Sequence, residues 1–313
     1  MIATLTLNAS LDLTVSLKKL DCKDINRIHE IQKDPGGKGI NISRIIHRLK
    51  GKTVAFGFLG GYTGKKIKEL LDEEGVPGNF VWISGENRSN ITIDLPGKTG
   101  QVKINEAGPR INKVELEPLI KKIFSSLTCG DFLLISGSIP CGINDKIYSR
   151  IIRIAHRRGI KTVLDADGES LYLGVRAKPF LIKPNIYEAQ RLLGRIRGRR
   201  VKISTEKDLL NAACDLSAAG PEIVIISWGP RGIIAASGGK FWRSYPPIKL
   251  KYGGVGAGDA VVAGFTHGFS RGGDIKNGIR WGIACGTAAT LQDGTKLCKA
   301  GDVKRLLKKV KIV

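Results

Sequence analysis

A single carboxylate, Asp259, stands where a glycine run gives way to an apolar segment in the stretch GGVGAGDAVVAGF, residues 253–265. Glycines before a helix let a ligand approach the main chain closely, and the first amides of a helix have no internal acceptors. These amides lie at the positive end of the helix dipole, which favours phosphate groups. The same pattern also fits a flexible loop followed by an acid that stabilises a helix start by about 0.3–1 kcal/mol. The glycine run by itself leaves both interpretations open.

The position of Asp259 beside the glycines favours a catalytic site. A carboxylate next to an anion site repels bound phosphate unless the carboxylate takes part in the chemistry. Phosphoryl transfer to a hydroxyl needs such a pair, because N–H donors stabilise the charged transition state while a carboxylate accepts the hydroxyl proton. Two other phosphate motifs do not match: GGYTGKKIK lacks the spacing of a Walker A loop, and GVGAGD is not G-x-G-x-x-G.

The elements that must position this site alternate between strand-like and helix-like segments. Apolar runs end in polar or glycine turns at residues 2–8, 53–60, 131–138, 161–167, 179–185 and 222–229, and amphipathic segments such as GINISRIIHRLK lie between them. This alternation predicts a mostly parallel sheet with helices on both faces. Ligands of such folds bind at the carboxyl ends of the strands. Candidate site segments are therefore the strand-end turns at Asn8 and at residues 136–138, 183–185 and 227–232.

Two stretches, residues 12–35 and 79–105, carry short β-like pieces with no helix between them. We expect them to form a small sheet that projects from the main domain as a lid, which could cover a site and exclude water. The predicted division is an α/β core of residues 1–11, 36–78 and 106–313 and a lid of residues 12–35 and 79–105. Such a lid exposes sheet edges, which proteins usually cover, so we expect a homodimer in which two lids pack together.

Composition argues against several other classes of protein. Of the 313 residues, 42% are hydrophobic and 25% charged, as in ordinary globular proteins. No window approaches the roughly 18 apolar residues of a membrane helix, and the N-terminus does not resemble a signal peptide, so we expect a cytoplasmic protein. The six cysteines have no metal or redox spacing and are expected to be mostly small core residues, and the four histidines fit no catalytic or metal motif.

The net charge of +23 is larger than solubility requires. Nucleic acid, an anionic membrane surface and phosphorylated substrates are all candidate partners for such a chain. The densest basic stretch, residues 191–202, has no interleaved aromatic residues and fits no nucleic-acid motif. This stretch is more typical of a solvated loop or helix end, and a nucleic-acid partner is not favoured.

Taken together, the strand-end motifs resemble those of a known family. GGVGAGDAVVAGF resembles the C-terminal signature, and PGGKGINISRIIHRL the N-terminal signature, of the ribokinase-like carbohydrate kinases of the phosphofructokinase-B family. TLNASLD, ISGSIP, KPN with Glu188 and SWGPRG follow in family order, so the resemblance spans nearly the whole chain. TLNASLD, GGKGIN, FVWISGENRSNI and INEAGP most resemble the branch of 1-phosphofructokinases and tagatose-6-phosphate kinases.

The resemblance implies both a fold and an activity. The fold is a ribokinase-like three-layer α/β sandwich with a mostly parallel central sheet and a small β-sheet lid. The activity is phosphorylation of a ketohexose phosphate by ATP with Mg²⁺, most closely of fructose 1-phosphate to fructose 1,6-bisphosphate. Tagatose-6-phosphate kinase and then 6-phosphofructokinase are the alternatives within the family. A catalytically weak regulatory relative and a basic nucleic-acid-binding protein are the alternatives outside enzymes.

For the sugar and the chemistry, the resemblance implies Asp259 as the general base and an anion hole made by the amides of Gly256, Ala257 and Gly258. The sugar would lie among Asp12, Gly37, Lys38, Gly39, Asn41 and Ser138. Lys38 and Arg88 would bind the phosphate already on the substrate, with Arg27 as a further candidate. Three of these residues keep alternatives: Asp12 as an acid that caps a turn, Asn41 as a helix cap and Arg27 as a solvated surface residue.

On the nucleotide side, the resemblance implies that ATP contacts Lys183, Asn185, Ser227, Gly229 and Gly232, together with Gly256 and Gly258. Asn185 and Glu188 would organise Mg²⁺ through water molecules. Glu188 could instead be a solvated helix acid, and residues 227–232 could be a tight turn between strands. The chain departs from the family at Gly253 and Gly254, where a side chain that braces the phosphate loop is missing, and at Lys103, where relatives often have an acid.

Overall fold

The apolar runs expected to be strands lie side by side in one sheet of the computed structural model, which describes residues 1–95, 101–250, 256–292 and 296–313. The strand order is β13-β12-β11-β10-β9-β8-β1-β4-β5. The parallel strands are β1 (Ile2–Thr6), β4 (Thr53–Gly60), β5 (Val81–Ile83), β8 (Phe132–Ser136), β9 (Lys161–Asp165), β10 (Leu181–Ile182) and β11 (Ile223–Ser227). Two antiparallel strands, β12 (Ile233–Ser237) and β13 (Lys240–Ser244), complete one edge.

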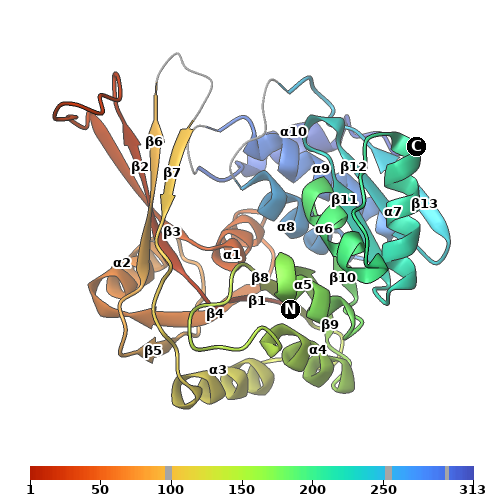
Figure 1. Cartoon of the computed structure of the whole chain (residues 1–313), viewed down its shortest axis with the longest axis horizontal. Coiled ribbons are helices and arrows are strands. Elements are labelled where there is room, and N and C mark those ends of the chain that lie inside the picture. The colour runs from red at the N-terminus through yellow and green to blue at the C-terminus, as the bar shows by residue number, and fades with distance from the viewer. Residues whose placement is uncertain (96–100, 251–255, 293–295) are drawn as a thin grey trace.

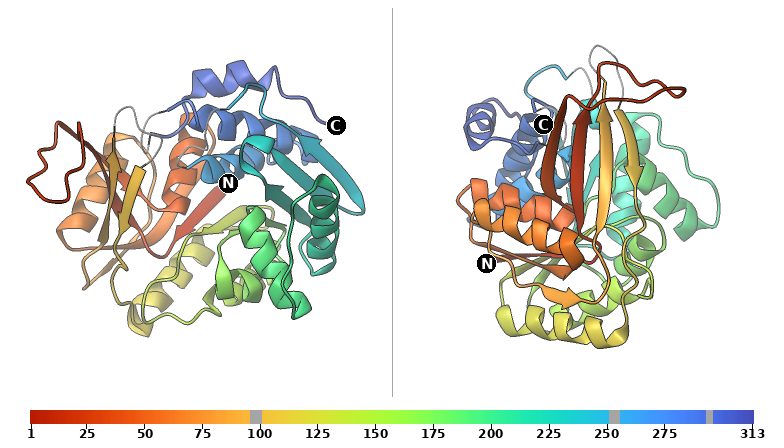
Figure 2. Two further views of the ribbon diagram at one scale, coloured as in Figure 1. Left: turned by 45° about the horizontal axis from the view of Figure 1, so that its top comes forward. Right: turned by 90° about the vertical axis from the view of Figure 1, so that its left-hand side faces the viewer.

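Helices cover both faces of this sheet (Figures 1 and 2). One face carries α3 (Lys113–Ser126), α4 (Ile147–Arg157), α5 (Gly168–Val175), α6 (Ile186–Arg197) and α7 (Glu206–Ala218), which share one buried apolar cluster with the strands. The other face carries α1 (Lys38–Arg48), α8 (Ala257–Phe269), α9 (Ile275–Ala289) and α10 (Ala300–Leu307), with a second cluster. Helix α2 (Gly61–Glu73) packs near α1 and the lid. The predicted three-layer α/β fold is confirmed.

Local sequence signals explain several helix boundaries. Asn112, Asn185 and Thr205 each cap a helix start with their side chains. The carboxylate three residues later accepts a hydrogen bond from the backbone amide of the cap residue. Helix α4 buries a stripe of Ile147, Ile151, Ile152 and Ala155 against the sheet. Amphipathic helices of this kind are stable mainly because they bury one face against the core.

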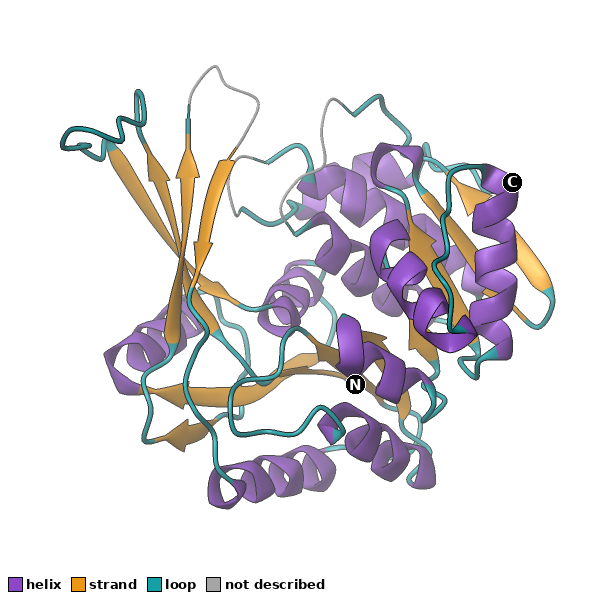
Figure 3. Cartoon of the chain, in the orientation of Figure 1, coloured by secondary structure: helices purple, strands orange, loops and turns teal. Residues whose placement is uncertain are grey.

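The four-stranded lid sheet has the order β3-β2-β6-β7 and projects from the core (Figure 3). Its strands are β2 (Ser10–Ser16), β3 (Glu30–Gly36), β6 (Arg88–Asp94) and β7 (Gln101–Asn105). We expected the second lid segment to begin at residue 79, but β5 pairs in parallel with β4 of the large sheet. Ile83 is buried against the core, so burial favours this pairing and the lid strands resume only at Arg88.

The expectation about the cysteines is wrong for four of the six. Cys22, Cys129, Cys141 and Cys214 are exposed, and only Cys285 and Cys298 are buried. Residue type alone does not determine burial, which depends on the face of each element that meets the core. No helix in the described part of the chain is long and apolar enough to cross a bilayer.

Candidate active site

A cleft of about 750 Å³ lies at the carboxyl ends of β10 and β11, next to the start of α8. Its lining brings together many of the predicted residues from both signatures and from the strand-end turns: Lys38, Lys183, Asn185, Glu188, Ser227, Gly229, Gly256, Ala257, Gly258 and Asp259. Parallel strands place their carboxyl ends at one edge of a sheet, which is why segments far apart in the chain meet here.

Asp259 lies in the first turn of α8 and is only 6% exposed. The helix begins after Gly256, whose φ of 73° is in the left-handed region that glycine adopts without strain. The amide Nδ2 of Asn41 donates a 3.1 Å hydrogen bond to Asp259 Oδ2. Asn41 lies inside α1, whose N-cap is Gly37, so the alternative of Asn41 as a helix cap is wrong. The two signature segments therefore meet at this carboxylate.

The surroundings of Asp259 tune its proton affinity. Burial raises the pKa of Asp259 to about 6, the positive charge of Lys38 opposes this rise, and the negative charge of Asp165 adds to it. A carboxylate with a pKa about one unit below neutral pH is mostly ionised there and still able to accept a proton. The surroundings of Asp259 are therefore compatible with the predicted role of general base.

Asp165 is a site residue that the sequence reasoning missed. It ends β9, and its Oδ1 lies 3.3 Å from Lys38 Nζ and 3.4 Å from Lys183 Nζ. The two ammonium groups lower the pKa of Asp165 although full burial acts to raise it. The segment KTVLDAD was identified as a strand with a polar end, so its strand-end carboxylate was the available signal. Asp165 holds two cations beside Asp259.

Asp12 lies on the lid side, within β2, so it does not cap a turn. Its Oδ1 accepts hydrogen bonds from Ser10 Oγ at 2.8 Å and from Asn90 Nδ2 at 2.9 Å. Burial raises the pKa of Asp12. A Cβ at Gly36, the last residue of β3, would lie 2.2 Å from Asp12 Oδ2, so a glycine at this position leaves room for the carboxylate.

Arg88 and Ser138 meet through Asn8, which follows β1. Arg88 donates to the Asn8 carbonyl from Nε at 3.3 Å and from Nη2 at 3.1 Å, and Asn8 Nδ2 donates to Ser138 Oγ at 3.2 Å. Arg88 is thus fixed at the base of the lid. Arg27 lies elsewhere, in the exposed segment that joins β2 to β3 beyond the ends of both strands.

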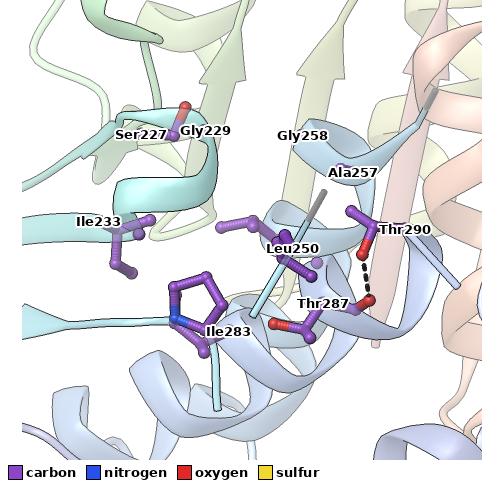
Figure 4. Close-up of a pocket in the computed structure, with 13 residues that line it drawn as sticks. Ser227, Gly229, Ile233, Leu250, Ala257, Gly258, Ile283, Thr287 and Thr290 are labelled. Carbon is purple, nitrogen blue, oxygen red and sulfur yellow. Dashed lines mark hydrogen bonds between the residues drawn. The ribbon is translucent and has the colours of Figure 1, made fainter. Parts of the chain in front are cut away.

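A smaller pocket of about 110 Å³ shares Ser227, Gly229, Ala257 and Gly258 with the cleft (Figure 4). The turn at Gly229–Arg231 joins β11 to β12, so both roles proposed for residues 227–232, strand connection and site lining, hold geometrically. Mostly apolar side chains that the sequence did not identify complete its wall: Pro246, Leu250, Val261, Ile283, Thr287 and Thr290. Helix α9 was expected, but its sequence does not say which residues face a ligand.

Asn185 and Glu188 form a capping box at the start of α6. Asn185 accepts from the amides of Tyr187 and Glu188, and Glu188 Oε2 accepts from the Asn185 amide at 2.7 Å. Glu188 is buried, so it is not a solvated helix acid. No cluster of three His, Cys, Asp or Glu suited to a metal occurs within the described ranges. Carboxylate and amide oxygens at the cleft nevertheless suit Mg²⁺, which usually keeps several water ligands.

The two departures from the signatures fall in different places. Gly253 and Gly254 lie outside the described residues. Lys103 lies exposed in β7, opposite Thr92 of β6. The described structure therefore bears on Lys103 alone, whose charge faces solvent.

The described architecture is a three-layer α/β core with a β-sheet lid and a buried carboxylate in the first turn of a helix that follows a glycine. The chain belongs to the pfkB family of carbohydrate kinases, which it matches over residues 5–300. It is 34% identical to a 1-phosphofructokinase of Borreliella burgdorferi, covering 100% of this chain and 98% of the relative. It is 36% identical to a tagatose-6-phosphate kinase of Staphylococcus epidermidis, covering 86% of this chain and 85% of the relative. A structure of phosphofructokinase-2 from Escherichia coli with substrates and products superposes with a TM-score of 0.91 at 29% identity, covering 98% of each chain.

Proposed function

We propose that this protein transfers the γ-phosphoryl group of ATP to a primary hydroxyl of a ketohexose phosphate, with fructose 1-phosphate as the preferred substrate and fructose 1,6-bisphosphate as the product. The observation that carries the proposal is the buried Asp259 at the start of α8. Two lysines that line the same cleft, Lys38 and Lys183, each form an ion pair with Asp165. A structural acid at a helix start needs neither burial nor a neighbouring cation pair.

The proposed reaction is a direct transfer. Asp259 accepts the proton of the sugar hydroxyl while the hydroxyl oxygen forms a bond to the γ-phosphorus of ATP. The bond from the γ-phosphorus to the β,γ-bridging oxygen breaks, and ADP leaves. The amides of Gly256, Ala257 and Gly258 at the positive end of α8 stabilise charge on the phosphoryl group. Lys183 lies close to this turn, since a Cβ at Gly258 would be 3.5 Å from its Nζ. The lysine adds positive charge at the same place.

The nucleotide fits the two connected pockets. The smaller pocket has apolar walls with threonine hydroxyls, which suit a flat base, while the larger cleft holds the cations. Asn185 and Glu188 would hold Mg²⁺ through water, and the bound ion would neutralise charge on the β- and γ-phosphates.

We place the sugar phosphate between the lid and α1. Asp12 offers a carboxylate to sugar hydroxyls, and Arg88 and Lys38 offer cations to the phosphate that the substrate already carries. The lid segments at residues 12–35, 88–95 and 101–105 would close over this half of the site and exclude water. We keep the division into a core and a lid as part of the proposal.

The choice of sugar rests on the relatives. The match to the 1-phosphofructokinase covers the whole chain, and the match to the tagatose-6-phosphate kinase is slightly higher in identity over a shorter span. Tagatose 6-phosphate is therefore the second candidate. Fructose 6-phosphate is the third, because a phosphofructokinase-2 shares the fold along nearly the full length.

A coupled ADP-release assay with fructose 1-phosphate, tagatose 6-phosphate and fructose 6-phosphate tests the proposal. The highest kcat/KM is expected for fructose 1-phosphate, with ADP release abolished when the sugar is omitted. A higher kcat/KM for another sugar would replace the substrate but keep the reaction. Absence of turnover with every sugar, together with salt-dependent retention on DNA, would replace the kinase with a nucleic-acid-binding protein.

We also propose a homodimer that forms through the lid. Paired residues share a face of a sheet, so the register places Val15, Ile31, Ile93 and Val102 in one row and Leu13, Ile91 and Ile104 in the next. This apolar face is opposite to the face of Asp12. Helix α2 covers it only near the root, and Ile31, Val102 and Ile104 are exposed. A tetrameric form of the phosphofructokinase-2 relative supports oligomerisation. A kinase that consumes ATP is expected in the cytoplasm.

A further inference from the structure

Arg44 is among the largest fully buried side chains of the described residues, yet it lines neither of the two pockets of the candidate site. It lies in α1, three residues after Asn41 and six after Lys38, and is 2% exposed. A buried guanidinium is costly unless its donors are paired. Its partners therefore reveal what the burial serves.

Arg44 joins its own helix, α1, to the end of α2 and to β3. Its Nε donates to both Glu74 carboxylate oxygens at 3.0 Å, at the C-terminal end of α2. Its Nη2 donates to Asp34 Oδ1 at 3.1 Å, and its Nη1 donates to the Pro35 carbonyl at 3.1 Å. Asp34 and Pro35 belong to β3, so the guanidinium fixes both a side chain and the main chain at the root of the lid.

The segment that Arg44 holds leads directly to the sugar side of the cleft. Asp34 of β3 lies opposite Asp12 of β2 in the strand register, and Gly36 lies next to the Asp12 carboxylate. The chain then enters α1, which carries Lys38 and Asn41. A shift at the end of β3 would thus change the position of Asp12 relative to Lys38. The nucleotide residues at the carboxyl ends of β10 and β11 belong to other strands.

We propose that Arg44 is a positioning residue for the sugar-phosphate half of the site: by pinning the root of β3 to α1 and α2, it keeps Asp12 and Lys38 in one fixed arrangement. The inference rests on the proposed kinase function. It predicts that loss of the guanidinium weakens use of the sugar phosphate while use of ATP is retained. A residue needed only for general stability would not separate the two substrates.

The test compares Arg44→Met with the double variant Arg44→Met/Asp34→Asn. The single variant leaves a buried carboxylate without its cation and is expected to lose stability. The double variant removes that charge and is expected to recover much of the melting temperature. Arg150→Met is the matched control, since Arg150 forms a forked pair with Glu117 between two exposed side chains away from the lid.

In the double variant we expect the KM for the sugar phosphate to rise about tenfold or more, with the KM for ATP within about twofold of wild type. Arg44→Lys keeps the charge but not the fork and is expected to give a smaller rise. Sugar-phosphate KM values within about twofold of wild type in the folded variants, or equal rises in both KM values, would overturn the proposal.

Hydrogen exchange separates this inference from the proposed function. Amides of residues 31–41 are expected to exchange faster in the double variant, and those of residues 223–237 at the wild-type rate. If the wild type phosphorylates none of the sugar phosphates, the proposed function fails, and exchange alone decides whether Arg44 pins the lid root. Unchanged exchange at residues 31–41 would then refute the role of Arg44.

Discussion

The side-chain amide of Asn41 donates a 3.1 Å hydrogen bond to the Asp259 carboxylate across 218 positions of sequence. The bond joins α1, which begins at the lid root, to α8, which begins at the glycine run. It orients the carboxylate and favours its ionised form, since an amide N–H can donate to a carboxylate. The proposed base is therefore held by the helix that also carries Lys38.

Asp259→Asn is expected to lower kcat by at least ~10²-fold, because an amide cannot accept the hydroxyl proton. Folding is expected to survive, since Asn also accepts the bond from Asn41. The raised pKa of Asp259 means that its buried charge destabilises the fold above pH about 6, and this cost fades as the pH falls from 6 toward the unfolded value. The variant should thus melt at or above the wild-type temperature at pH 8.

Asp302→Asn is the matched control for that experiment, because Asp302 lies in the first turn of α10 and does not line the cleft. It should leave kcat unchanged. Near-normal kcat in Asp259→Asn would remove Asp259 from the role of base.

The pH profile should carry the signature of Asp259. The kcat/KM for the sugar phosphate is expected to fall on the acid side with a midpoint near pH 6, as the base becomes protonated. Lys38→Met should move this midpoint upward, because the Lys38 charge holds the pKa of Asp259 down. Lys52→Met, an exposed change beyond the same helix, should not move it. An unchanged pH midpoint of kcat/KM in Lys38→Met would show that another group controls the profile.

Arg88→Ala and Lys38→Ala are each expected to raise the KM for the sugar phosphate about tenfold or more, and the KM for ATP much less, because each removes a cation from the substrate's own phosphate. Lys103→Ala removes an exposed cation from the same lid and serves as the control. Steady-state kinetics with each substrate varied in turn gives the comparison. Equal rises in both KM values for Lys38→Ala would assign this lysine to the transferred phosphoryl group.

Asp165→Asn is expected to lower both stability and turnover, because it leaves Lys38 and Lys183 without their shared carboxylate. Breaking one side of a buried ion pair typically costs about 3–5 kcal/mol. Since the pKa of Asp165 is lowered by folding, its stabilisation is present above the ordinary aspartate pKa of about 4 and is lost in more acid solution. Thermal melts at pH 7 and in acid should show the difference shrinking.

Asp167→Asn provides the control two residues away, where an exposed carboxylate pairs with Arg191. Such a pair contributes about 0–1 kcal/mol. A melting temperature of Asp165→Asn equal to that of this control would mean that the two lysines do not depend on Asp165.

Ile104→Lys is expected to convert the dimer into a monomer, because it places a charge on the exposed apolar face of the lid. Sedimentation over a range of concentrations measures the change. Val114→Lys alters an 82% exposed valine on α3 and should leave the dimer intact. A wild-type chain that sediments as a monomer at every concentration would contradict the dimer.

The sequence by itself predicted most of the elements and a chemistry for the site. Apolar runs that end in polar or glycine turns, with amphipathic segments between them, indicated the strands and helices, since these signals act within a few residues. The glycine run before Asp259 and the motifs at the strand ends indicated phosphoryl transfer, because that chemistry needs those residue types at those spacings. Strand β5 was assigned to the wrong sheet, since its partner is set by which neighbour buries Ile83 rather than by its own residues.

Only the tertiary structure decided which charges meet. The contact of Lys38 with Asp165 and the bond from Asn41 to Asp259 join residues 127 and 218 positions apart. The partners of Arg44 lie only 9 to 30 positions away, but in other elements of the fold. Burial then sets the pKa of Asp259 near 6, and burial is a property of the packed core. Local patterns carry no information on these distances, because they depend on how layers of helix and sheet pack together.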